Sequence, residues 1–115
     1  PHDFISLLEK EPWLSFTLDT EHTFSGGKQE AAEYIEHLHS RIAVVHVSAF
    51  IDGKMHCRTK DNTDVAHVLT LLAGYGYSGP LILEIEDLTF QPELSLRKKI
   101  DILSDETAWL RTFFE

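Results

Sequence analysis

Three apolar segments of the sequence each end in a side chain that can bind a metal ion. These side chains are Asp19, which follows the run FTL, His46, which follows IAVV, and Glu84, which follows LIL. Parallel α/β proteins place their active-site groups at the C-terminal ends of buried strands. Two carboxylates and an imidazole form a mixed oxygen and nitrogen ligand set that suits a divalent cation. Together the three segments therefore predict a metal site formed by Asp19, His46 and Glu84.

Two further histidines, His22 and His56, come shortly after the first two segments. His22 lies three residues after Asp19. Residues three apart on a continuous strand point to opposite faces of a sheet, so these two can converge only if the chain bends after Asp19. His56 lies in the polar stretch after the second segment, beside Cys57. Because a thiolate–histidine zinc site needs further cysteines, we interpret Cys57 as a loop or packing thiol.

Each candidate ligand also has an ordinary structural explanation. Asp19 could be a cap, with His22 a plain loop histidine, and His46 taken alone could be a satisfied core or sheet-edge histidine. Glu84 could form a salt bridge with a lysine or arginine, because a buried carboxylate is costly unless it is paired or bound to a cation. The recurrence of such side chains at three successive strand ends favours the metal site over these separate explanations.

The segments around these residues alternate between helix and strand patterns. Apolar spacing and caps predict helices over 3–11, ended by Pro12, over 28–40, and from Thr63 or Asp64 to Gly74. A last helix of about 20 residues is expected from Pro92 and Glu93 onward, with a break near Ser104-Asp105. The expected strands are 13–18, 42–48 and 81–85, and the expected loops are 23–27 and 49–62.

Alternating strands and helices predict a parallel α/β sheet with right-handed crossovers. We expect residues 1–115 to form one partial domain of three βα units preceded by a short helix. Three strands are a thin sheet with exposed edges, so this sheet should be part of a larger one. The remaining strands would come from another segment or from a second copy of the chain, and the isolated residues should self-associate. The first residue is Pro1 rather than Met, which fits a processed chain or a piece of a longer one.

Composition limits the partners and the compartment. The formal net charge is −9, which argues against sequence-independent binding of nucleic acid, because such binding needs clustered Lys and Arg. Cys57 is the single cysteine, so no intrachain disulfide can form and a reducing, cytoplasmic location is expected. The sequence contains no apolar run of roughly 20 residues that would span a membrane, and no signal peptide is visible.

At these residues the sequence resembles the xylose-isomerase-like TIM barrels, the superfamily of sugar phosphate isomerases and epimerases and of endonuclease IV. The motifs that carry the resemblance are Leu18-Asp19-Thr20-Glu21-His22, then Val45-His46-Val47-Ser48, then Gly76 to Ile85, GYSGPLILEI. They span nearly the whole chain and correspond to the last three βα units of a (β/α)8 barrel. The resemblance thus implies an α/β fold that forms the C-terminal part of such a barrel.

The resemblance also implies roles for individual residues. Asp19, His46 and Glu84 would hold a divalent ion, with Mn, Mg, Zn and Co as candidates. In the epimerase branch, Glu84 and a glutamate from an earlier strand would move protons on either side of a ketose carbonyl, and His22 would contact the sugar substrate. In the nuclease branch, several zinc ions are held and His22 and His56 would be ligands as well.

Three departures from the family pattern bear on the choice between these branches. Ala49 stands where the family has an aspartate three residues after the strand histidine, and Lys54 replaces an aspartate two residues before His56. The glycine-rich segment that usually follows is Arg58-Thr-Lys-Asp-Asn. We therefore expect a metal-dependent sugar or sugar-phosphate isomerase or epimerase. The alternatives are an endonuclease-IV-like DNA repair enzyme and a non-catalytic barrel segment that acts in assembly.

Overall fold

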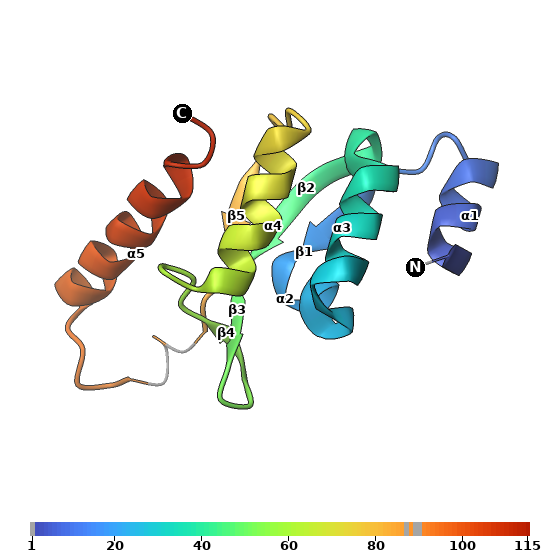
Figure 1. Cartoon of the computed structure of the whole chain (residues 1–115). Coiled ribbons are helices and arrows are strands. Elements are labelled where there is room, and N and C mark those ends of the chain that lie inside the picture. The colour runs from blue at the N-terminus through green and yellow to red at the C-terminus, as the bar shows by residue number, and fades with distance from the viewer. Residues whose placement is uncertain (1, 87, 89–90) are drawn as a thin grey trace.

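The chain alternates helices with strands around one small parallel sheet (Figure 1). The structure is a computed structural model that describes residues 2–86, 88 and 91–115. Its strands are β1 (Phe16–Asp19), β2 (Ile42–Val47), β3 (Ala49–Ile51), β4 (Lys54–Cys57) and β5 (Leu81–Leu83). Its helices are α1 (His2–Lys10), α2 (Thr20–Thr23), α3 (Gly27–Leu38), α4 (Thr63–Gly74) and α5 (Leu96–Arg111), with short 3-10 turns η1 (Phe24–Gly26) and η2 (His39–Arg41).

The parallel sheet has the strand order β1-β2-β5, and β3 and β4 form a separate antiparallel hairpin. Along the chain, β1 is followed by α2 and α3, β2 by the β3–β4 hairpin and then α4, and β5 by α5. The mixed α/β architecture with parallel strands is compatible with part of a TIM barrel. Among the described residues, no further strand pairs with the outer edges of β1 and β5.

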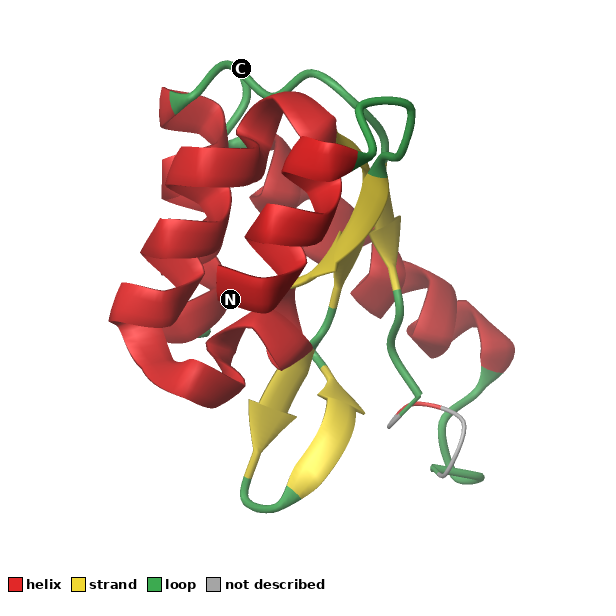
Figure 2. Ribbon diagram, turned by 90° about the vertical axis from the view of Figure 1, so that its right-hand side faces the viewer, coloured by secondary structure: helices red, strands yellow, loops and turns green. Residues whose placement is uncertain are grey.

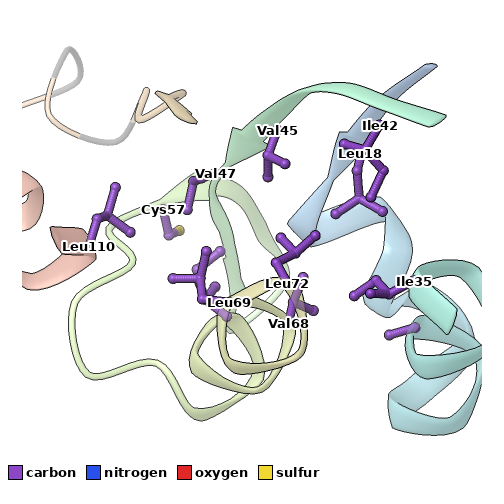
Figure 3. Packing of buried hydrophobic residues seen from close by; sticks show 13 residues of the cluster. Leu18, Ile35, Ile42, Val45, Val47, Cys57, Val68, Leu69, Leu72 and Leu110 are labelled. Carbon is purple, nitrogen blue, oxygen red and sulfur yellow. The ribbon is translucent and has the colours of Figure 1, made fainter. Parts of the chain in front are cut away.

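One face of the sheet carries the core. Leu18 of β1 is in register with Val45 of β2, and both side chains are buried together with Val47. In Figure 3 these side chains point toward the apolar residues of α4, which include Leu69 and Leu72. Figure 2 shows α3 and α4 lying against this same face of the sheet. Apolar residues recur at every second position along the strands and about every 3.6 residues along the helices, and these residues pack together in one layer.

The opposite face of the sheet is more open. Its side chains alternate with the core residues, so Thr17, His46 and Ile82 point away from α3 and α4. Ile82 is 46% exposed although it lies in a strand next to β2. The sheet therefore has one face covered by helices and one face whose side chains are more exposed.

The stretch 49–62, expected to be a loop, contains the β3–β4 hairpin. Asp52 and Gly53 form its two-residue turn, and both have positive φ, 51° and 79°. An Asp-Gly pair is the sequence signal for this kind of turn, which matches the twist of the two strands. The expectation of a loop was therefore wrong, because the Asp-Gly turn joins two short strands, AFI and KMHC, within this stretch.

Several element bounds also differ from the prediction. The first strand starts at Phe16, and Trp13 before it is 77% exposed. The expected loop 23–27 is mostly helical turn, and α4 is capped by Asn62 rather than by Thr63 or Asp64. The last helix begins later than Pro92 because Ser95 caps it, and it runs unbroken through Ser104-Asp105. The strands β2 and β5 end one and two residues earlier than expected.

The last helix touches the core only near its C-terminal end. Leu110 is buried in the main core, whereas Leu96 at the other end of α5 is 74% exposed. None of the helices in the described part of the chain is long and apolar enough to cross a membrane.

Candidate metal centre

The side chains of Asp19, His46 and Glu84 converge at the C-terminal ends of the three parallel strands. One ligand atom from each residue lies within 4.8 Å of the ligand atoms of the other two. Asp19 and His46 are register partners in β1 and β2. Among the described residues, this is the one group of at least three histidine, cysteine, aspartate or glutamate side chains close enough to share an ion.

Strand register explains how residues so far apart in sequence meet. His46 is in register with Ile82 of β5, and Glu84 lies two residues farther along the chain, on the same side as Ile82. The N–H of Glu84 donates a 3.0 Å hydrogen bond to the carbonyl of Val47, which extends the β2–β5 pairing past the end of β5. The carboxylate is thus held beside the imidazole by main-chain pairing.

Asp19 is a helix cap, as the structural explanation expected, and its side chain also belongs to the group of Asp19, His46 and Glu84. As the N-cap of α2, its Oδ1 accepts hydrogen bonds from the N–H groups of Glu21, at 2.9 Å, and His22, at 3.1 Å. A carboxylate at a helix N-terminus is favoured by the orphan N–H groups there. The cap also orients the side chain, so Asp19 is fixed at the strand end where it faces His46.

His46 and Glu84 contact each other directly. His46 Nδ1 lies 3.1 Å from Glu84 Oε2, and their side chains are 35% and 39% exposed. The alternative explanation for Glu84 was a salt bridge to a lysine or arginine, but the partner that the structure gives it is this histidine. Partial exposure leaves the pair open to a small ligand from the open face of the sheet.

The structure does not bring His56 into the group of Asp19, His46 and Glu84. His56 adopts a positive φ of 52° at the end of the hairpin. Its main-chain N–H donates a 2.8 Å hydrogen bond to Glu21 Oε2, and its Nδ1 lies 3.9 Å from that oxygen. The structure therefore places the His56 ring beside the carboxylate of Glu21 rather than beside Asp19, His46 and Glu84.

His22 stands beside the site with an exposed side chain. It lines a cleft of about 370 Å³ together with Asp19, and it also lines a second cleft of about 460 Å³. The second cleft lies between α2, the hairpin and the start of α4, and Phe24, Phe50 and Met55 supply much of its apolar wall. His22 thus lies where a molecule bound next to Asp19 would meet it.

Sequence reasoning missed the residues that support these strand ends. Glu21 is buried, and its carboxylate accepts a hydrogen bond from the Ser48 hydroxyl as well as from His56. Thr20 Oγ1 donates to the carbonyl of Ser48 and accepts from its N–H, which joins the ends of β1 and β2. These partners are mostly main-chain atoms, so no pattern of side chains in the sequence points to them.

The donor set suits a divalent ion. Carboxylate and imidazole ligands stand about 2.0–2.2 Å from Zn²⁺ or Mg²⁺, so two ligands of one ion lie at most roughly 4.4 Å apart. Donor atoms within 4.8 Å of one another need only small side-chain rotations to reach that spacing. One imidazole and two carboxylates are also compatible with Mn²⁺ and Co²⁺.

Comparison with known proteins places the chain in a family. The family model described as "Xylose isomerase-like TIM barrel" matches residues 2–112, nearly the whole chain. Neither the curated proteins nor the solved structures contain a match. This family includes isomerases and epimerases as well as endonuclease IV. The chain, with its parallel strands and the cluster at their C-terminal ends, belongs to the xylose isomerase-like TIM barrel family.

Proposed function

We propose that this chain supplies the metal site of a sugar or sugar-phosphate isomerase or epimerase that works by proton transfer next to a carbonyl. The observation that carries the proposal is the convergence of Asp19, His46 and Glu84 within 4.8 Å at three neighbouring strand ends. The site lies on the open face of the sheet, where a polyhydroxylated substrate can approach. We further propose that residues 1–115 form a single partial barrel domain that needs additional strands.

The chain's own residues would divide the work as follows. Asp19, His46 and Glu84 would hold Mn, Mg, Zn or Co, and a divalent ion bound there would polarise a carbonyl oxygen and stabilise the enediolate. Glu84 would accept and return the proton on one side of that carbonyl, as a general base and then acid. The exposed imidazole of His22 would contact substrate hydroxyl groups, since it lines the cleft beside Asp19.

The structure gives a multi-zinc nuclease less support. That chemistry would recruit the His56 ring to the cluster, whereas the ligand atoms that lie within 4.8 Å of one another among the described residues belong to Asp19, His46 and Glu84. Lys54 lies on β4 two residues before His56, and the net charge of −9 disfavours a phosphate backbone. Small-molecule sugars therefore fit the site better than nucleic acid.

The first test is the metal content of the protein purified without added metal or chelator. About one divalent ion per chain is expected in the wild type and none in the Asp19→Ala variant. Two or three zinc ions per chain would instead favour the nuclease. Absence of metal from the wild type, even after incubation with Mn²⁺, Co²⁺ or Zn²⁺, would contradict the proposed site.

The second test addresses chemistry, using the chain together with the segment that completes its barrel. Ketoses and ketose phosphates incubated in D₂O should gain deuterium next to the carbonyl. The Glu84→Gln variant should lose this exchange by at least about 100-fold while remaining folded, because a positioned acid–base group typically contributes about 10²–10⁴-fold. Glu36→Gln, the same chemical change at an exposed position on α3, is the matched control.

A further inference from the structure

The three candidate ligands are linked by the residues that follow each of them by two positions. Glu21 follows Asp19, Ser48 follows His46, and Glu86 follows Glu84 in this way. The Glu21 carboxylate accepts a 3.1 Å hydrogen bond from Ser48 Oγ. The remaining links run through the main chain of His56.

His56 connects Glu21 to the third strand. Its N–H donates to Glu21 Oε2 at 2.8 Å, and its carbonyl accepts a 2.8 Å hydrogen bond from the N–H of Glu86. A continuous series of hydrogen bonds therefore runs from the end of β1 to the segment that carries Glu84. The positive φ of His56, 52°, is uncommon for a residue with a Cβ, and such a conformation persists where surrounding contacts hold it.

Glu21 is the centre of this arrangement. Its side chain is only 4% exposed, and a carboxylate so buried is costly unless its lone pairs are used. One oxygen, Oε2, accepts from both Ser48 and His56. The main-chain N–H of Glu21 also donates to Asp19 Oδ1, at 2.9 Å. One residue thus contacts the first ligand directly and reaches the segments of the other two.

We infer that Glu21 is a positioning residue for the metal centre, whose buried carboxylate sets the relative placement of Asp19, His46 and Glu84. This inference rests on the proposed function, because it assumes that these three residues bind an ion. Groups that orient metal ligands without touching the ion typically change metal affinity by about 10–100-fold when they are removed. The hairpin then has a role of its own: it delivers the His56 main chain to Glu21.

The test measures Co²⁺ affinity by titration calorimetry and by the visible absorption of the bound ion, on the full chain. Glu21→Met keeps the approximate size but removes the acceptor, and a loss of about 10–100-fold in Co²⁺ affinity with a changed spectrum is expected. Glu21→Gln should remain within about threefold of wild type, because its amide oxygen can accept both hydrogen bonds at the Oε2 position. Glu30→Gln on α3 is the control for a remote carboxylate.

The outcomes distinguish a failure of the positioning role of Glu21 from a failure of the proposed metal site. If the wild type binds Co²⁺ and a folded Glu21→Met variant binds it equally well, the positioning role is overturned while the metal site stands. If the wild type binds Mn²⁺ or Zn²⁺ but no Co²⁺, the same affinities are measured with that ion; if it binds none of the three, the proposed function fails and this inference fails with it. Should Glu21→Met not fold, the Ser48→Ala variant is measured instead, because it removes the hydrogen bond from the Ser48 hydroxyl to the Glu21 carboxylate. Unchanged Co²⁺ affinity and an unchanged spectrum in Ser48→Ala would overturn the positioning role of Glu21.

Discussion

The hydroxyl of Thr59 donates a 2.7 Å hydrogen bond to Oε2 of Glu106, and both residues are completely buried. The N–H groups of Thr59 and Lys60 donate to the same oxygen, and Arg58 Nε donates to the other one at 2.9 Å. Glu106 therefore attaches α5 to the segment after the hairpin. Residues 58–60 thus hold α5 against the rest of the chain through hydrogen bonds to one buried carboxylate.

Stability should depend on pH through Glu106. Burial by itself raises the pKa of Glu106, but the hydrogen bonds from Thr59, Arg58 and Lys60 outweigh it and hold that pKa below its ordinary value. The carboxylate of Glu106 therefore binds a proton more readily in the unfolded chain than in the folded one. Its contribution to the free energy of unfolding is fully present above the pKa of the unfolded state, about 4.3. It should be lost as the pH falls through the lower pKa of the folded state.

Urea unfolding at several pH values tests this prediction. Glu106→Gln should lower the free energy of unfolding at pH 7 by about 1–3 kcal/mol and weaken its fall in acid. Asp105→Asn is the control, since Asp105 is exposed and its partner Lys60 is at the surface, so little change is expected. An acid-induced loss identical in Glu106→Gln and wild type would contradict the assignment.

Arg41 should hold α1 to the rest of the protein. Its guanidinium donates to the carbonyls of Leu8, Glu11 and Leu14, which lie at the end of α1 and in the segment before β1. Lysine cannot supply this planar fork of donors. We expect Arg41→Lys to cost about 1–3 kcal/mol of stability and to speed amide exchange in α1. The exposed Arg97→Lys is the control; equal exchange in both variants would rule out the anchor.

His56 should act through its main chain. Glycine accepts a positive φ without strain, so His56→Gly should keep the metal content and leave stability within about 1 kcal/mol of wild type. His56→Val, which disfavours this φ, should be clearly less stable. Metal analysis and thermal unfolding measure both effects. Loss of bound metal from the folded glycine variant would show instead that the ring is a ligand.

The isolated 115 residues should self-associate through the open face and edges of the parallel sheet. Ile82 is 46% exposed on that face, and β1 and β5 carry unpaired outer edges among the described residues. Ile82→Lys should shift sedimentation equilibrium toward monomer, because a charge on this face opposes edge and face contacts. Ile51→Lys, at the exposed hairpin tip, is the control; a wild type that stays monomeric at high concentration would refute the prediction.

The existence and order of the main elements could be predicted because their patterns are local. Apolar runs such as Ile42 to Val45 and the helical spacing of Val65, Val68 and Leu72 identify strand and helix without knowledge of their partners. The errors lie where a short signal was overlooked or where capping decides a boundary. The Asp52-Gly53 turn and the Ser95 cap are examples, and both are visible in the sequence.

By itself the sequence determined the family and three polar side chains at strand ends, because residue type and strand position are properties of the chain alone. Only the tertiary structure decided that Asp19, His46 and Glu84 meet, since strand register and order create that proximity. The hydrogen-bond partners of Glu21 and Glu106 were likewise decided only by the tertiary structure. A buried carboxylate is satisfied mainly by main-chain N–H groups and hydroxyls from distant segments, and such partners exist only once the chain has folded.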